Sequence, residues 1–388
     1  MSSVHHDQNG EVLELGRRLV SRVLEPMKRR FVGKDEIIDL MGIALVAGEN
    51  LFLLGPPGTA KSALVYELGR RVRGPVFEYL LTRFTEPNEL FGPFDIRRLR
   101  EGELVTNTEG MLPEAALVFL DELLNANSAI LNSLLTALNE RVFRRGREKR
   151  DLPTLIVLGA SNRLPEDEAL AALFDRFLLR VTCDNVPVDR LTEVLDRGWT
   201  LDLGIDEPAE GVEVEDVRRL HGALAGVALS GLRGQIADLV VRLRHAGLAV
   251  SDRRAVKLQR LVAASALLCG RHEATISDLW VFRHVWDTIE QQEVLAAIVQ
   301  NVLESAQPTA ADHPRARAHV PDPEAIARQL AELQSRAGDA TLSDADRAVL
   351  KDKLGLLSAR CQWISHPSHG EALNRQVEQL WQTLGGRA

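Results

Sequence analysis

The segment LFLLGPPGTAKSALV, residues 51–65, combines residue types that bind phosphate. An apolar run leads into a turn rich in glycine and proline, and Lys61 and Ser62 then open a helix-forming stretch. In such a strand–loop–helix unit, loop amides and the helix N-terminus face the anion. The lysine would reach the β- and γ-phosphates, and the serine hydroxyl would coordinate Mg²⁺. Residues 55–62 are therefore predicted to bind a nucleotide with Mg²⁺.

Ala60 departs from the usual phosphate loop, G-x-x-x-x-G-K-[ST], which has glycine just before the lysine. An alanine there matters only if the backbone needs a positive φ, at a cost of about 1 kcal/mol. That cost is too small to abolish nucleotide binding by a loop whose other elements are intact.

A second apolar run, residues 117–120, ends at the acidic pair Asp121 and Glu122. Open α/β sheets bind their ligands at the carboxyl ends of the strands. Asp121 would hold the Mg²⁺ shell, and Glu122 would polarise the attacking water. An acidic pair after a strand is usually only a helix N-terminal charge, but together with the phosphate loop it predicts nucleotide hydrolysis.

Two further residues could serve the same reaction. Asn162, after the apolar run in LIVLGASN, could orient the water against the γ-phosphate, or could only make a turn. Arg176 in LFDRF could stabilise transition-state charge, which is worth roughly 10³ to 10⁵ in rate. It could equally form an ion pair with Asp175. For Arg176 the sequence leaves both interpretations open.

The elements that must position these residues follow from the hydrophobic pattern. Short apolar runs alternate with helical segments, which predicts an α/β fold whose central parallel sheet is covered by helices. From residue 189 to 306 the pattern is almost wholly helical, which indicates a separate all-α domain. A Pro/Ala/His-rich linker and three helices follow in residues 307–388, and the last helix has an apolar face that fits a small helical bundle.

Composition excludes several classes of protein. The formal net charge of -8 argues against a general polyanion-binding surface. Three widely spaced cysteines predict neither a disulfide framework nor a zinc site. No apolar run approaches membrane-spanning length and the N-terminal residues do not resemble a signal peptide, so we expect a cytoplasmic protein without membrane insertion.

These motifs, in this order, resemble the AAA+ ATPases, and specifically the MoxR group, which includes the type called regulatory ATPase variant A. The group writes its phosphate loop as GPPGTAKS, as residues 55–62 do here. The resemblance covers residues 31–289. It assigns Asp121 and Glu122 to the Walker B pair, Asn162 to sensor 1, and Val32 and Gly33 to backbone contacts on the adenine side. Its Walker A loop corresponds to Gly55, Pro57, Gly58, Thr59, Ala60, Lys61 and Ser62.

The resemblance implies ATP and Mg²⁺ as cofactors and a homo-oligomeric ring, typically a hexamer, whose active sites lie between subunits. It places the AAA+ α/β domain at residues 1–188, an all-α lid at 189–306, and the linker and C-terminal helices at 307–388. Arg176 matches the arginine finger, which serves the nucleotide of the neighbouring subunit. Arg253 matches the sensor 2 arginine of the lid, with the adjacent Arg254 as the alternative.

Two inserts are also implied by the resemblance. Residues 84–112 are similar to the insert of the second helix in this clade, and their turns and the segment ELVTN suggest a β-hairpin that faces the pore of the ring. Residues 139–153 are similar to a second hairpin and are strongly basic. This basic run is either a solvated hairpin tip or a contact with an acidic client or neighbouring subunit.

The function implied is that of a chaperone-like motor that remodels or matures a protein client, with a von Willebrand A domain partner. An AAA+ motor that acts on nucleic acid is the alternative. The net negative charge of the chain argues against this alternative, and the basic hairpin favours it. The acidic pair argues against a scaffold that binds ATP without hydrolysing it. The sequence contains no [NT]-K-x-D motif of the kind that recognises guanine, so specificity for GTP is not expected. The β-rich partner-binding insertion of the regulatory variants is not expected, because HPRARAHVPDPEAI leads straight into helices.

Overall fold

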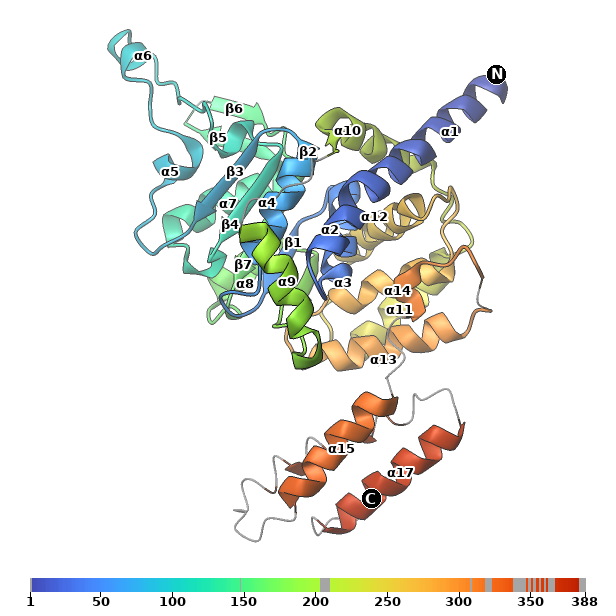
Figure 1. The fold of residues 1–388 in the computed structure, drawn as a ribbon. Coiled ribbons are helices and arrows are strands. Elements are labelled where there is room, and N and C mark those ends of the chain that lie inside the picture. The colour runs from blue at the N-terminus through green and yellow to red at the C-terminus, as the bar shows by residue number, and fades with distance from the viewer. Residues whose placement is uncertain are drawn as a thin grey trace. The chain divides into compact units, whose positions relative to one another are not determined.

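The computed structural model describes residues 2–146, 148–202, 210–307, 309–317, 323–337 and 367–383, with scattered positions between 347 and 361. The chain divides into two compact units, Met1–Ala316 and Arg317–Ala388. The first unit contains all the residues predicted to carry chemistry. Its elements are drawn in Figure 1, with labels where there is room.

A five-stranded parallel sheet forms the centre of the first unit, with strand order β3-β4-β7-β1-β8. The inner strands β4, β7 and β1 are buried almost throughout, because helices cover both faces of the sheet. The α/β fold predicted from the alternating apolar runs is therefore confirmed. The strands are β1 (Leu51–Leu54), β3 (Val76–Leu80), β4 (Leu117–Asp121), β7 (Ile156–Ser161) and β8 (Leu179–Thr182).

The helices that cover this sheet enclose one apolar core with it. A π-helical turn interrupts the N-terminal helices, and Leu24 of that turn packs closely over Gly42, where a Cβ would lie 2.6 Å from the leucine side chain. These helices are α1 (Ser2–Leu19), η1 (Val20–Leu24), α2 (Glu25–Arg30), α3 (Asp35–Ala47), α4 (Lys61–Arg71), α7 (Ser128–Glu140) and α8 (Glu168–Phe174).

Among the described residues that follow β8, the first unit is mainly helical, with an isolated bridge between Ala228 and Glu273 and the short strand β9 (Val212–Glu213), which pairs with β2 (Val72–Arg73). Its α12 lies against α3 and α1, so this region shares the core of the α/β part. The division predicted at residue 188 stays a prediction. The helices are η4 (Val188–Arg190), α9 (Leu191–Asp202), α10 (Val214–Ala223), η5 (Leu224–Gly226), α11 (Arg233–His245), α12 (Asp252–Leu268), η6 (Ile276–His284), α13 (Gln291–Glu304) and α14 (Pro314–Arg317).

The two inserts differ from each other. Residues 139–153 contain the predicted hairpin, formed by β5 (Val142–Arg145) and β6 (Glu148–Asp151). Residues 84–112 do not form the expected β-hairpin: they contain α5 (Pro87–Phe91), α6 (Ile96–Arg100) and one isolated bridge between Phe94 and Thr106. The physical reason is capping, because the Asp95 side chain accepts hydrogen bonds from the first amides of α6. Two short 3-10 turns, η2 (Leu112–Glu114) and η3 (Leu123–Asn125), flank β4.

The second unit has its own small apolar cluster. Leu330 of α15 (Pro323–Ala337) and Val377 of α17 (Pro367–Thr383) belong to it, as a small bundle requires. The middle one of the three predicted C-terminal helices falls mainly outside the described residues. Among the described residues, no helix is long and apolar enough to cross a membrane.

Candidate active site at the carboxyl edge of the sheet

The loop after β1 lies where the predicted phosphate site should be. The Gly55 amide donates to the Ser161 carbonyl oxygen at 3.0 Å, which fixes the start of the loop against β7. A Cβ on Gly55 would lie 2.2 Å from the carbonyl oxygen of Cys183, so only glycine fits here. Gly58 turns the loop with φ 81°, and the Thr59 hydroxyl donates to the Pro56 carbonyl at 2.9 Å.

Ala60 has φ 69° and ψ 21°, the left-handed conformation that usually requires glycine. The backbone therefore does need a positive φ here, which is the condition under which the alanine carries a cost. The strain is about 1 kcal/mol, and the loop forms in spite of it.

Lys61 folds back over this loop. Its Nζ donates to the carbonyl oxygens of Gly55 and Pro56, each at 2.8 Å, and the residue is only 8% exposed. One of the three ammonium protons is left without a partner in these contacts. The side chain thus holds a positive charge directly over the loop, at the start of α4, where the helix dipole also favours an anion.

Ser62 and the acidic pair complete this edge. The Ser62 Oγ lies 3.5 Å from an Asp121 Oδ, although the two residues belong to different strand–helix units. Glu122 follows with φ 49°, and its amide donates to the Asp121 carboxylate at 2.9 Å. The left-handed backbone turns the chain sharply at the strand end, so the two adjacent carboxylates can serve different partners.

Burial and the neighbouring Asp121 carboxylate raise the pKa of Glu122, while Lys61 and Arg163 partly offset this effect. A raised pKa makes this carboxylate a better proton acceptor, which suits a residue that polarises water. Burial, and less strongly Asp121, also raise the pKa of Glu78 on β3. The carboxyl edge is therefore a site of concentrated negative charge with Lys61 and Arg163 as its cations.

Asn162 directly follows β7, which lies between β4 and β1, so it stands at the same edge as Asp121 and Gly55. Its side chain is exposed, so a ligand at this edge could reach it. Its neighbour Arg163 was not among the residues predicted from the sequence. Arg163 donates to Asn125 at 3.3 Å and acts on Glu122 electrostatically. Its position in the sequence could have identified it, because Arg163 directly follows Asn162 at the end of the same strand.

Val32 and Gly33 stand beside this edge, on the path from α2 to α3. Gly33 has φ 70°, and a Cβ there would lie 3.5 Å from the Val186 side chain and 3.7 Å from the Arg190 guanidinium. The adjacent Lys34 donates to the carbonyl oxygen of Asp184. The predicted adenine side is thus built from the segment before α3 and the segment after β8.

Arg176 lies at the opposite, amino edge of the sheet. The Asn50 side chain, which precedes β1, donates to the Arg176 carbonyl at 2.9 Å, whereas Lys61 follows the loop beyond the end of β1. A strand rises about 3.3 Å per residue, so a four-residue strand separates the two edges by roughly 10 Å or more. The Arg176 guanidinium forms an ion pair with Asp175 at 2.8 Å, one of the two interpretations left open by the sequence.

Arg253 lies with Arg176 and not with Lys61. Both line one small cavity at the amino edge, together with Lys257 of α12. Among the described residues, Arg253 is exposed and has no hydrogen bond or ion pair, whereas Arg254 is buried. The two adjacent arginines therefore have different environments, and only Arg253 is available to a ligand.

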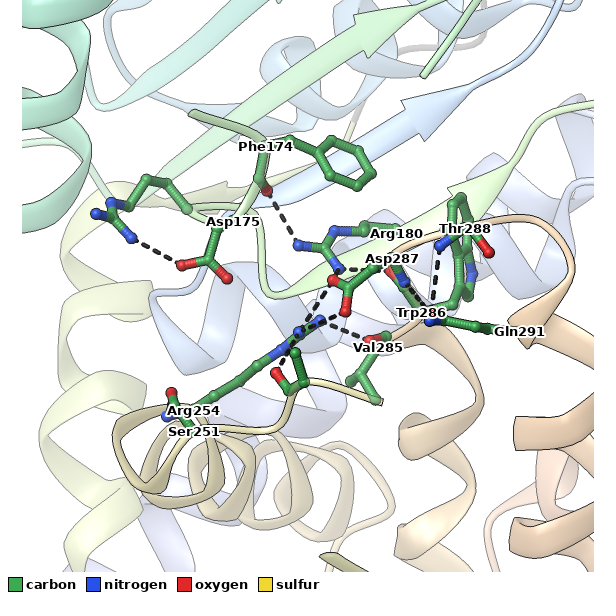
Figure 2. A network of polar contacts seen from close by, with 12 residues as sticks. Phe174, Asp175, Arg180, Ser251, Arg254, Val285, Trp286, Asp287, Thr288 and Gln291 are labelled. Atoms are coloured by element: carbon green, nitrogen blue, oxygen red, sulfur yellow. Dashed lines mark hydrogen bonds and ion pairs between the residues drawn. The ribbon is translucent and has the colours of Figure 1, made fainter. Parts of the chain in front are cut away.

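Arg254 belongs to a buried polar network that joins β8 to the helical region (Figure 2). It donates to Asp287 at 3.0 Å and to the Val285 carbonyl oxygen. Arg180 of β8 donates to the same Asp287 and lies over the ring of Phe174. Burial, and less strongly the charge of Arg254, lower the pKa of Arg180 to about 10, so it stays charged at neutral pH.

The side chains at the carboxyl edge fit a nucleotide with Mg²⁺. Among the described residues, no cluster of three or more His, Cys, Asp or Glu side chains could hold a metal ion. Mg²⁺ in phosphoryl-transfer sites does not need such a cluster, because it takes one or two carboxylates and completes its shell with phosphate oxygens and water. Ser62 and Asp121 supply this kind of donor set beside the Lys61 ammonium.

Two basic residues of the second hairpin contact the 84–112 insert. Arg145 donates to the Gly92 carbonyl oxygen and stacks on Phe94 at 3.9 Å. Arg150 donates to Thr108 at 2.8 Å. These contacts fasten the hairpin to the 84–112 insert.

Comparisons with known proteins agree with this geometry. Residues 17–222 match a family model described as the MoxR domain in the MoxR-vWA-beta-propeller ternary systems, and residues 230–299 match an AAA lid domain. An uncharacterized protein of Methanocaldococcus jannaschii is 34% identical over 73% of this chain and 74% of its own length. The chaperone MoxR1 of Mycobacterium tuberculosis is 25% identical over 58% of each chain.

A solved structure shows the same fold. The crystal structure of a candidate ATPase from Cytophaga hutchinsonii superimposes with a TM-score of 0.61 at 19% identity, and the match covers 77% of this chain and 97% of that one.

Proposed function

Because this chain belongs to the MoxR family of AAA+ ATPases, we propose that its ATP hydrolysis drives a chaperone-like motor that remodels or matures a protein client. The single observation that carries the site assignment is the meeting of Lys61, Ser62 and Asp121 at one strand edge. The chaperone role is supported by the name of the MoxR1 relative.

We propose ATP and Mg²⁺ as the cofactors, held at the carboxyl edge. The loop amides of residues 55–60 and the Lys61 ammonium bind and orient the phosphates, and Ser62 and Asp121 hold the metal. Bound Mg²⁺ would neutralise charge on the transferred phosphoryl group. Glu122 accepts a hydrogen bond from the attacking water, and Asn162 orients that water.

Arg176 and Arg253 lie too far from Lys61 to complete the site of their own chain. We propose that they act on the nucleotide of a neighbouring subunit, whose carboxyl edge faces this amino edge. A contact between two different faces repeats from copy to copy, and it forms a ring when the rotation between copies closes. Six subunits are expected for this family, and each interface would then contain one complete active site.

A partner with a von Willebrand A domain is also proposed. The support is the description of the matching family model, which names such a domain in the systems of that model. In this proposal the partner selects the client, and conformational changes of the ring, driven by ATP hydrolysis, remodel it.

The test is a substrate trap with the full chain. Glu122→Gln should bind ATP and assemble but hydrolyse about 10² to 10⁴ times more slowly, because the water loses its proton acceptor. Proteins that copurify in ATP with Glu122→Gln, and not with Lys61→Ala, are clients or partners. The mechanism is refuted if Glu122→Gln neither retains ATP nor assembles.

A further inference from the structure

Helix α9 carries an uncovered apolar stripe. With the preceding turn η4 it places Val188, Leu191, Leu195 and Trp199 at spacings of three, four and four residues, which is one helix face. These side chains are 86, 47, 65 and 66% exposed, respectively. Contiguous exposed apolar side chains of this size mark an interaction surface.

The other side of α9 is held against the chain. Val194 and Gly198, beside the stripe, are half-buried. Arg197 donates to the Arg29 carbonyl oxygen, and Arg190 and Arg197 both pair with Glu193 along the helix. These contacts hold the helix in place, while the four side chains of the stripe remain exposed in the described part of the chain.

The stripe stands beside the carboxyl edge. Helix α9 begins soon after Thr182, the last residue of β8, and Cys183 packs against the phosphate loop at Gly55. The adjoining Arg190 approaches Gly33 on the predicted adenine side. A second chain that docks on α9 would therefore lie close to the predicted nucleotide site.

The opposite, amino edge of the sheet also has exposed apolar side chains. On α12, Val256 is 63% exposed and lies one turn after Arg253. Ile289, two residues after Asp287 in the network of Figure 2, is also exposed. The amino edge thus presents apolar side chains directly beside the cations that the proposed function directs to another subunit.

Charge complements this match. The carboxyl edge contains the carboxylates Asp121 and Glu122, while Glu193 of α9 is already paired with Arg190 and Arg197. The amino edge gathers cations around the buried Glu49, which pairs with Lys257 at 2.6 Å. Its cations are Arg141, Arg176, Arg253, Lys257 and Arg260.

We propose that the occupant of the α9 stripe is a second copy of this chain, which docks its amino edge around Val256 and Ile289 onto the stripe. This docking rests on the proposed function, in which Arg176 and Arg253 serve a neighbour. The stripe then holds the neighbouring edge against the nucleotide site, so that the site is completed only in the assembled state.

The first test measures assembly by sedimentation velocity, with and without a slowly hydrolysed ATP analogue. Leu195→Glu and Trp199→Glu should each raise the protein concentration needed for assembly by about 30-fold or more, as for a central apolar contact. Leu99→Glu on α6, another half-exposed leucine, is the matched control and should assemble normally. Normal assembly of both stripe variants overturns the proposal.

The second test identifies the occupant. A Trp199→Cys chain is mixed with a Val256→Cys chain and treated with a short bis-maleimide, with the wild type as the control for Cys269, which is only partly buried. A cross-linked dimer that forms only in the mixture supports the proposal. Cross-linking of Trp199→Cys chains to each other, or no product between the two chains, overturns it.

Nucleotide binding separates this proposal from the proposed function. A fluorescent ATP analogue should bind the stripe variants within about threefold of the wild-type affinity, because the phosphate loop is unchanged, while hydrolysis falls together with assembly. If the wild type and the stripe variants all assemble and all hydrolyse ATP, only the α9 proposal fails. If the wild type binds no ATP and stays monomeric, both fail.

Discussion

The Ser62 hydroxyl lies 3.5 Å from the Asp121 carboxylate, although 59 residues separate the two in the sequence. One residue opens α4 and the other ends β4, and the parallel order of the sheet brings both to the same edge. This short distance joins the phosphate loop and the acidic pair into one site.

Loss of either side chain should weaken the use of Mg²⁺. In Ser62→Ala or Asp121→Asn, the Mg²⁺ concentration that supports half-maximal hydrolysis should rise by about 10- to 100-fold, because the metal loses one protein donor. Titration of ATPase activity with Mg²⁺ measures this shift. Ser133→Ala on α7, whose hydroxyl donates only to a carbonyl of its own helix, is the control. An unchanged midpoint in both site variants contradicts the assignment.

The strain at Ala60 predicts that Ala60→Gly is tolerated. Glycine adopts φ 69° without penalty, so the free energy of unfolding should rise by up to about 1 kcal/mol, and hydrolysis should stay within about threefold. Urea unfolding and steady-state ATPase assays measure both quantities. Gly55→Ala should instead destabilise the loop strongly, since its Cβ would clash with the Cys183 carbonyl. A large loss of activity in Ala60→Gly would be the contrary result.

Mixing experiments decide between the two roles of Arg176. Arg176→Ala should lose about 10³-fold or more in hydrolysis if the arginine stabilises the transition state. A mixture of Arg176→Ala and Lys61→Ala chains should regain activity, because some interfaces pair an intact Lys61 with an intact Arg176. Activity equal to the sum of the two separate variants would mean that Arg176 does not act between chains.

His313 predicts an acid-sensitive fold. Burial, only partly opposed by Asp278, lowers the pKa of His313 to about 4, and its Nδ1 accepts a hydrogen bond from the Arg315 amide at 3.1 Å. Because the unfolded chain binds the proton more readily, the free energy of unfolding falls as pH falls from about 6.5 to about 4. The difference between the pKa of His313 in the folded and unfolded chain corresponds to a change of about 3 kcal/mol in the free energy of unfolding.

The check is urea unfolding at several pH values in this range. His313→Asn keeps a hydrogen-bond acceptor but does not titrate, so its stability should change less with pH than that of the wild type. Identical pH dependence in the two proteins would show that other groups govern acid unfolding.

Asp287 should be a strong stabilising residue of the first unit. It is the carboxylate partner of both Arg180 and Arg254, which are buried, so Asp287→Ala should cost about 3 kcal/mol or more by leaving these charges unpaired. Urea unfolding, followed through the fluorescence of the adjacent Trp286, measures the loss. Glu103→Ala removes an exposed partner of Arg98 and should cost less than about 1 kcal/mol. Equal losses in the two variants would contradict a central role for Asp287.

Much of the fold and the carboxyl edge could be predicted because the signals are local. An apolar run that enters a glycine-rich turn before Lys61 specifies strand, loop and helix within fifteen residues. The acidic pair is likewise fixed by its position at a strand end. The prediction of a hairpin in the 84–112 insert was wrong, since its turn residues Asp95 and Glu86 serve as helix caps.

The amino-acid sequence alone determined the phosphate loop, the acidic pair and the parallel sheet that carries both. It could do so because strand periodicity and motif spacing depend only on residues that are close together in the sequence. Which arginine is available depends instead on folding in three dimensions. Arg253 and Arg254 are adjacent and chemically identical, and burial against Asp287 separates them. The position of Arg176 at the edge opposite Lys61 likewise depends on how β1 and β8 pair across the sheet.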